Sequence, residues 1–285
     1  MSYVLMFPGQ GAQRPGMGAE WFDRFPELTA AADEILGYSI RELCVDDQDG
    51  RLGRTVYTQP AVYTVNALGW RALRETEGAP DLAIGHSLGE YNALEAAGVF
   101  DFADGLRLVA ARARAMSAVT GGGMAAVVGL DDAVLRLVLR RSGLTGVEAA
   151  NFNTRDQTVI AGPVDELPAA GEALREAGAR AVRHLDVSGP FHTSHMAPAV
   201  AGFAPELKAA RLAAPAFPVI ANRTARPHRD GEIDGVLLEQ IDHPVLWRHT
   251  VEALLSEGHT RFHEAGGSTV LTRMLRALRR ELAAA

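Results

Sequence analysis

The stretch Gly85-His86-Ser87-Leu88-Gly89 decides how this chain folds, because it links a short apolar strand pattern over Asp81–Gly85 to a helical pattern over Leu88–Ala97. It matches G-x-S-x-G, in which a sharp strand-to-helix turn exposes the serine hydroxyl as a nucleophile. Backbone N–H groups at the start of the helix lie near such a serine, and that of Leu88 is the nearest candidate for an oxyanion hole. The alternative is a chance pentapeptide at a strand–helix junction, but the strand before it and the helix after it favour Ser87 as a nucleophile.

Strand and helix patterns alternate on both sides of this turn. Tyr3–Phe7 is an apolar β run, and Gln59–Thr76 and Phe102–Val119 have the periodicity of amphipathic helices. Alternating strands and helices predict a mainly parallel sheet that is covered on both faces. Together with the serine turn, this predicts a large α/β-hydrolase-like domain over residues 1–121 and 189–285.

The pattern changes after Gly121-Gly122-Gly123, which is a natural hinge. The elements that follow have the order β-α-β-β-α-β, which is typical of a ferredoxin-like fold. We therefore expect a small ferredoxin-like subdomain over residues 122–188, inserted into the large domain. Its expected strands are Met124–Leu130, Val147–Asn151, Thr158–Gly162 and Ala179–Val187, and its expected helices are Asp132–Arg141 and Val164–Ala177.

The composition is that of a globular protein with a sizeable core. The 285 residues are 47% hydrophobic and 22% charged, and 28 basic against 35 acidic residues give a net charge of −7, which argues against a nucleic-acid binder. No apolar stretch approaches the roughly eighteen residues of a membrane span, and the N-terminus is typical of a first strand and not of a signal peptide. The single cysteine, Cys44, excludes an internal disulfide and predicts the reducing cytoplasm.

A nucleophilic serine needs a base, and the loop Gly189–Ser194 offers His192 where the chain re-enters the large domain. A loop at a domain junction is a place where a histidine can face a cleft. His86 adjoins the serine, but successive residues of a sharp turn point in different directions. His192 and His195 could instead form a metal pair, although no carboxylate motif accompanies them and their spacing is not that of a zinc-protease helix.

Two further features bear on ligand binding. Phe7-Pro8-Gly9-Gln10-Gly11 resembles part of a dinucleotide fingerprint, but Arg14 occupies the place of its third glycine. A tight loop that offers the Gln10 N–H to a ligand is the better interpretation. Arg112 and Arg114 lie in an apolar helix, so at least one of them must face outward, while the other could pair with a substrate carboxylate.

Taken together, these motifs resemble one family over essentially the whole chain. The order of Phe7-Pro8-Gly9-Gln10-Gly11, Gly85-His86-Ser87-Leu88-Gly89-Glu90, Arg112 and Gly189-Pro190-Phe191-His192 is similar to that of malonyl-CoA:acyl carrier protein transacylases. This family includes free-standing acyltransferases that serve polyketide synthases in trans. The resemblance extends to Thr58-Gln59-Pro60 and to Asp242-His243-Pro244-Val245-Leu246-Trp247.

The resemblance implies a function and a role for individual residues. The enzyme would transfer malonyl from malonyl-CoA to the phosphopantetheine thiol of an acyl carrier protein, for polyketide or fatty-acid synthesis, without a cofactor or a metal. We expect a cytoplasmic monomer whose partners are the carrier protein and the CoA thioester, without nucleic acid or membrane. The implied roles are nucleophile for Ser87, base for His192, oxyanion hole for Gln10 and Leu88, carboxylate clamp for Arg112, histidine orientation by the Gln240 carbonyl, and malonyl selectivity for Phe191.

Two other functions remain open at the level of the sequence. An editing acyl hydrolase on the same fold would release acyl groups from carrier proteins by admitting water. Arg112 favours the transferase, because a hydrolase of neutral acyl chains gains nothing from a cation. A non-catalytic module that docks carrier proteins is disfavoured by the presence of both Ser87 and His192.

Overall fold

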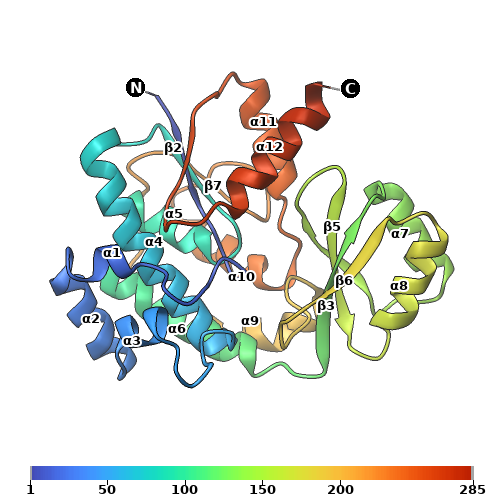
Figure 1. Ribbon diagram of the computed structural model, residues 1–285, viewed down its shortest axis with the longest axis horizontal. Helices are drawn as coiled ribbons and strands as arrows, with labels where there is room; N and C mark the ends of the chain where they lie inside the picture. Colours follow the sequence, from blue (N-terminus) through green and yellow to red (C-terminus); the bar gives the residue numbers. More distant parts are fainter. Residues whose placement is uncertain (1, 284–285) are drawn as a thin grey trace.

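The structure is a computed structural model that describes residues 2–283, and it contains two separate β-sheets (Figure 1). One sheet is parallel and belongs to what we call the large lobe. The other is antiparallel and belongs to the small lobe, which comprises residues 122–185. This mixed α/β architecture confirms the predicted fold class, whereas the domain boundaries after residues 121 and 188 stay a prediction.

The sheet of the large lobe has four parallel strands in the order β7-β2-β1-β8. These are β1 (Val4–Phe7), β2 (Leu82–Gly85), β7 (Val219–Ile220) and β8 (Phe262–Glu264). Because the strands are parallel, their carboxyl ends meet at one edge, where the serine turn follows β2 and the Gln10 loop follows β1. The sheet therefore brings together two segments that are far apart in the sequence.

Helices cover both faces of this sheet, and the alternation of β1 explains why. Leu5 and Phe7 pack into a core with helices α2 to α6, α9 and α10, while Val4 and Met6 pack on the opposite face with α11 and α12. The helices are α1 (Ala19–Phe22), α2 (Pro26–Leu36), α3 (Ile40–Val45), α4 (Thr55–Glu77), α5 (Gly89–Ala96), α6 (Phe102–Ser117), α9 (Ala197–Ala209), α10 (Ile233–Asp242), α11 (Trp247–Ser256) and α12 (Val270–Ala283), with a 3-10 turn at Ser194–Met196.

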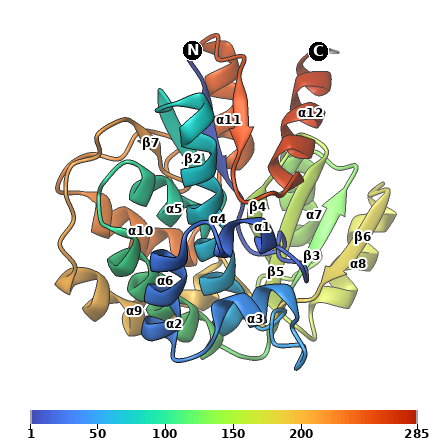
Figure 2. The same cartoon turned by 60° about the vertical axis from the view of Figure 1, so that its left-hand side comes forward.

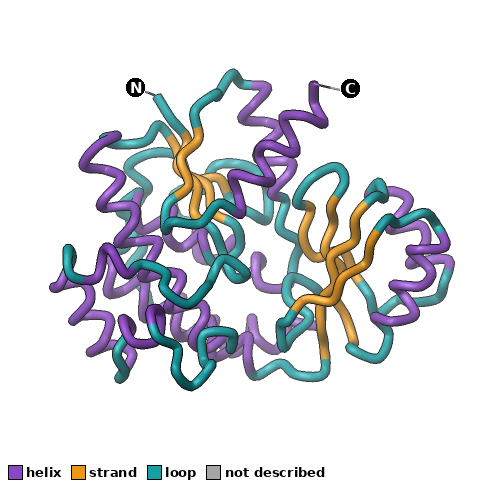
Figure 3. Tube along the Cα trace, in the orientation of Figure 1, coloured by secondary structure: helices purple, strands orange, loops and turns teal. Residues whose placement is uncertain are grey.

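The small lobe has the predicted β-α-β-β-α-β order and a four-stranded antiparallel sheet arranged as β4-β5-β3-β6. Its elements are β3 (Gly122–Val128), α7 (Asp132–Arg141), β4 (Glu148–Phe152), β5 (Gln157–Pro163), α8 (Leu167–Glu176) and β6 (Ala181–Leu185). Helices α7 and α8 cover its outer face, and the other face is turned toward the large lobe (Figure 3). Met124, Ala126 and Val159 on that inner face line a cleft between the lobes.

The two lobes are joined by more than the chain crossings. The Phe152 amide donates to the Val245 carbonyl at 3.0 Å, and the Val245 amide donates to the Ala150 carbonyl at 2.9 Å, so β4 pairs with a segment of the large lobe. Helix α12 runs along the boundary between the lobes (Figure 2). Among residues 2–283, no helix combines the length and the apolar character that crossing a membrane requires.

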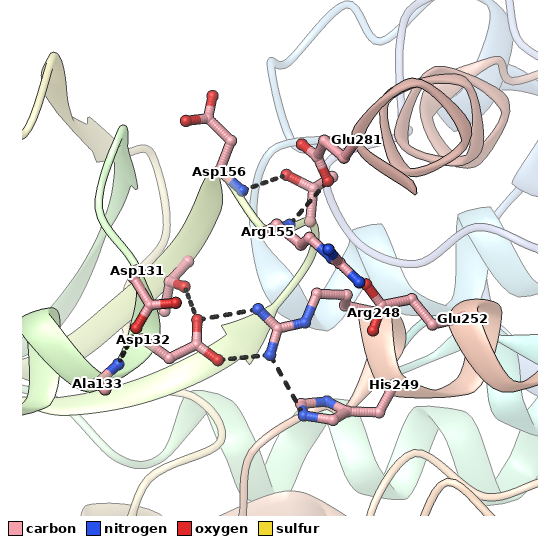
Figure 4. A network of polar contacts seen from close by, with 11 residues as sticks. Asp131, Asp132, Ala133, Arg155, Asp156, Arg248, His249, Glu252 and Glu281 are labelled. Atoms are coloured by element: carbon pink, nitrogen blue, oxygen red, sulfur yellow. Dashed lines mark hydrogen bonds and ion pairs between the residues drawn. The ribbon is translucent and has the colours of Figure 1, made fainter. Parts of the chain in front are cut away.

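An ionic cluster adds a third link between the lobes (Figure 4). Arg248 of α11 makes a two-point contact with Asp132 at the start of α7, with distances of 3.2 and 2.6 Å. Arg155, in the turn between β4 and β5, donates from Nε to Glu252 at 2.7 Å and from its amide to Glu281 at 3.0 Å. These contacts hold the small lobe against α11 and α12.

Candidate active site

The serine turn is a left-handed kink that only small neighbours allow. Ser87 has a φ of 51°, which is unusual for a residue other than glycine and is typical of a functional strained turn. A Cβ atom at position 85 would lie 2.0 Å from the carbonyl carbon of Gly89, and one at position 89 would lie 2.0 Å from the Phe7 carbonyl oxygen. Both glycines are therefore required for strand β2, helix α5 and the end of β1 to approach one another.

The structure brings Ser87 and His192 together, although 105 residues separate them in the chain. Oγ of Ser87 lies 2.7 Å from Nε2 of His192, and Nδ1 of His192 lies 2.7 Å from the carbonyl oxygen of Gln240. A carbonyl oxygen only accepts, so Nδ1 carries the proton and Nε2 is the free acceptor for the serine hydroxyl. The tautomer is thus the one that a general base requires.

Burial keeps this histidine neutral. His192 is buried, and burial, together with the nearby Arg112 cation, lowers the pKa of its imidazole from 6.5 to about 3. The hydrogen bond to the Gln240 carbonyl acts in the opposite direction but is weaker. His192 is therefore unprotonated and available as a base across the neutral pH range.

The two arginines of helix α6 have different surroundings. Arg112 is buried and Arg114 is exposed, so the structure places Arg112 in the cleft. Nη2 of Arg112 donates to Ser87 Oγ at 3.1 Å and to the Gln240 side chain at 2.9 Å, while Nη1 donates to Gln59 at 2.7 Å. Burial lowers the pKa of Arg112, but all three partners accept hydrogen bonds from its cationic form.

A cavity of about 250 Å³ opens beside Ser87, between the lobes. Gln10, Leu88, Phe191 and His192 line it together with Arg112. Within residues 2–283, neither the backbone N–H of Gln10 nor that of Leu88 donates a hydrogen bond to protein, so both are available to a ligand, whereas the side-chain amide of Gln10 donates to Thr55. Six of the seven implied site residues therefore share one cavity, and the seventh, Gln240, contacts His192 and Arg112 without lining it.

The remaining histidine candidates lie differently. Nε2 of His86 lies 2.9 Å from Asn153 Oδ1 of the small lobe and the ring packs against Trp247, so His86 lines the cavity but makes no hydrogen bond to Ser87. Nε2 of His195 lies 2.7 Å from the Gly146 carbonyl. Among the described residues, no group of three or more His, Cys, Asp or Glu side chains is arranged to hold a metal ion.

Sequence reasoning missed Asn222, which holds the backbone amide of the serine turn. Asn222, which follows β7, accepts a hydrogen bond from the Ser87 amide at 2.6 Å through its side-chain oxygen. A polar residue at the carboxyl end of a strand beside β2 was the available signal, because the carboxyl ends of parallel strands meet at one edge.

Comparisons with known proteins agree with this geometry. The family described as "Acyl transferase domain" matches residues 4–283. The chain is 43% identical over 282 residues to the polyketide biosynthesis malonyl CoA-acyl carrier protein transacylase PksC of Bacillus subtilis, covering 98% of this chain and 97% of PksC. It is 49% identical over 277 residues to the polyketide biosynthesis protein ThaF of Burkholderia thailandensis, covering 97% of this chain but only 24% of ThaF.

A solved structure is similar over the entire fold. The crystal structure of a malonyl CoA-acyl carrier protein transacylase from Burkholderia pseudomallei superposes with a TM-score of 0.95 at 47% identity, covering 99% of both chains. The matched family spans both lobes and every residue of the cavity described above. The chain therefore belongs to the acyl transferase domain family.

Proposed function

We propose that this protein transfers a malonyl group from malonyl-CoA to the phosphopantetheine thiol of an acyl carrier protein, through an ester on Ser87. The observation that carries the proposal is the buried Arg112 cation, 3.1 Å from the Ser87 hydroxyl. A malonyl carboxylate is separated from its reacting carbonyl by one CH₂ group, so it would lie within reach of this guanidinium. PksC, which matches along nearly its full length, is named as an enzyme of this activity.

The first half-reaction acylates the serine. The Ser87 hydroxyl gives its proton to Nε2 of His192 as Oγ attacks the thioester carbonyl of malonyl-CoA. The backbone N–H groups of Gln10 and Leu88 would donate to the oxyanion of the tetrahedral intermediate. The C–S bond then breaks, the thiolate of CoA takes the proton from His192, and the malonyl ester remains on Ser87.

The second half-reaction reverses these roles with a different thiol. The phosphopantetheine thiol of the carrier protein gives its proton to His192 and attacks the ester carbonyl. The bond to Ser87 Oγ breaks, and the serine recovers the proton from His192. The Gln240 carbonyl keeps the imidazole oriented throughout, so a Ser–His dyad is sufficient and no acidic third residue is invoked.

The competing function is an editing acyl hydrolase, in which water takes the place of the carrier thiol. Arg112 weighs against it, because a buried cation beside the nucleophile favours an acyl group that carries its own carboxylate.

The names of PksC and ThaF favour a role in polyketide biosynthesis over one in fatty-acid synthesis. The single cysteine, Cys44, is free and buried, which is compatible with the reducing cytoplasm, where we place the reaction.

The decisive experiment is labelling with radioactive malonyl-CoA. Wild-type protein should hold one stable malonyl equivalent per chain and pass it to a holo-carrier protein, and Ser87→Ala should hold none. Ser194→Ala is the matched control, because this hydroxyl lies in the same loop as His192 but contacts Glu148 instead of the cavity. Labelling of Ser87→Ala, or none of wild type, would reject the proposal, and release of free malonate faster than transfer to any holo-carrier would favour the hydrolase.

A further inference from the structure

Glu90 is a fully buried carboxylate three residues after the candidate nucleophile, in the first turn of α5. Its Oε2 accepts hydrogen bonds from the backbone N–H of Asn222 at 3.1 Å and from the side-chain amide of Gln240 at 2.6 Å. Its Oε1 lies 2.7 Å from Nε2 of His228. A buried carboxylate is costly unless it is well partnered, and all three contacts come from segments that are distant in the sequence.

Two of these partners hold the peptide groups of Ser87. The side-chain oxygen of Asn222 accepts from the Ser87 amide at 2.6 Å, and Nε2 of Gln240 donates to the Ser87 carbonyl at 3.0 Å. Both peptide groups of Ser87 are thus held by residues that are themselves hydrogen-bonded to Glu90. A serine keeps a left-handed backbone conformation only where its surroundings enforce it.

Gln240 extends the same anchorage to the base and to the cation. Its backbone carbonyl accepts from Nδ1 of His192 at 2.7 Å, and its side-chain oxygen accepts from Arg112 at 2.9 Å. Gln240 therefore connects Glu90 with the guanidinium through its side chain and with the imidazole through its backbone carbonyl. Among residues 2–283, no carboxylate forms an ion pair with Arg112, so Glu90 is linked to the guanidinium only through Gln240, and no carboxylate of the protein competes with that of a substrate.

We propose that Glu90 is a positioning residue for acyl transfer: by anchoring Gln240 and Asn222, it sets the conformation of Ser87 and the orientation of its base. The inference rests on the proposed function, but it concerns rate and not the identity of the nucleophile. Glu90 does not line the cavity, so it acts only through the residues that it holds.

Two substitutions separate this role from simple loss of structure. In Glu90→Gln, the side-chain oxygen can still accept hydrogen bonds from Asn222 and Gln240. The new NH₂ group can donate to Nε2 of His228, provided that the imidazole carries its proton on Nδ1. Glu90→Ala removes the anchor altogether. Glu95→Gln is the matched control, because Glu95 is a second buried carboxylate on α5 that pairs with Arg71 and does not line the cavity.

The measurement is the single-turnover rate of malonyl-enzyme formation, together with its final stoichiometry. The final amount of malonyl bound per chain gives the fraction of molecules that are folded and competent. The rate of acylation of that fraction reports how well Ser87 and its base are positioned. Glu90→Ala should lose about 100-fold in this rate, the loss expected for a misplacement of roughly 1 Å, while the KM for malonyl-CoA changes little. Glu90→Gln should recover most of the rate, and Glu95→Gln should match wild type.

The outcomes distinguish the two proposals. If wild type takes no label, the proposed function fails, whatever Glu90 does. If wild type is labelled and Glu90→Ala reacts at the wild-type rate per folded site, the positioning role is wrong. It is also wrong if Glu90→Gln is as slow as Glu90→Ala, since retained hydrogen bonds would then not restore the geometry.

Discussion

Nη2 of Arg112 donates a 3.1 Å hydrogen bond to Oγ of Ser87, so a buried cation contacts the same oxygen that lies 2.7 Å from Nε2 of His192, its proposed base. A buried arginine beside a nucleophile stabilises negative charge that develops there, and it can also hold a carboxylate carried by the acyl group. The same contact thus links the reactivity of the serine to the choice of substrate.

Replacement of Arg112 by alanine should change substrate preference. The ratio of kcat/KM for malonyl-CoA over acetyl-CoA should fall by about tenfold to hundredfold, the value of a charge-assisted hydrogen bond of about 1.5–3 kcal/mol. The ratio is measured on one preparation, so it does not depend on the fraction that is folded. Arg114→Ala, two residues along the same helix but exposed, should leave the ratio unchanged. An unaltered ratio in Arg112→Ala would argue against the carboxylate clamp.

Phe191 should restrict the acyl group to malonyl. Its side chain is buried and lines the cavity immediately before His192 in the chain. Phe191→Ala removes the ring and opens space for an α-methyl group, so discrimination between malonyl-CoA and methylmalonyl-CoA should fall by about tenfold or more. Competition between the two thioesters in one reaction measures this directly. Equal discrimination by both proteins would place the selectivity elsewhere in the cavity.

The gathering of the candidate site residues in one cavity was largely predictable because most of them lie in local motifs. Ser87 lies in a turn whose glycines and flanking elements are contiguous, and the His192 loop marks the return of the chain from the inserted strands. The choice between Arg112 and Arg114 was not predictable from the sequence. They are two residues apart on one helix, and only the packing of α6 decides which one is buried.

The support around the nucleophile depends on long-range strand order, which the sequence does not state. A strand over Phe217–Ile220 is indicated by the sequence, but Asn222 reaches Ser87 only because this strand, β7, pairs with β2, and no sequence pattern states that pairing. Helices α1, α2 and α3 were likewise not predicted, and the one or two turns of α1 and α3 give no clear apolar repeat. Helix α4 begins at Thr55 and continues through Pro60, whereas the pattern predicted a start at Gln59.

The contact between Asp132 and Arg248 should contribute to the stability of the assembled lobes. The two side chains are only 18% and 12% exposed, and their contact is two-pronged, so water screens it less than a surface pair. Asp132→Asn should lower the free energy of unfolding by about 1.5–3 kcal/mol. Urea titration followed by circular dichroism measures the change.

A surface pair serves as the control for this effect. Asp23 contacts Arg41 in the large lobe and is 77% exposed, so Asp23→Asn should change the free energy of unfolding by less than about 1 kcal/mol. Equal destabilisation by the two substitutions would mean that the contact between the lobes is worth no more than an exposed ion pair.

The pH dependence of acylation should lack the inflection of an ordinary histidine. Burial and the Arg112 cation lower the pKa of His192 to about 3, so the imidazole is already neutral at every pH well above that value. The rate of malonyl-enzyme formation should therefore stay level between about pH 5 and 8, where a histidine with a pKa of 6.5 would lose most of its basic form at the acid end. Quenched-flow measurement across this range tests the expectation, and an acid limb centred near pH 6.5 would contradict it.

The same shift fixes the sign of a stability effect. Below pH 6.5 the unfolded chain binds a proton at His192, whereas the folded chain does not bind it until the pH approaches 3. The free energy of unfolding therefore decreases progressively as the pH falls from 6.5 toward 3. His192→Gln removes the titrating group and should make unfolding less sensitive to acid than in wild type. Urea titrations at about pH 7 and 5 give the free energy of unfolding of each protein. Between these two pH values, wild type should lose more of this free energy than His192→Gln. A wild type that lost no more stability than His192→Gln over this interval would show that the imidazole is protonated as easily in the folded protein as in the unfolded chain.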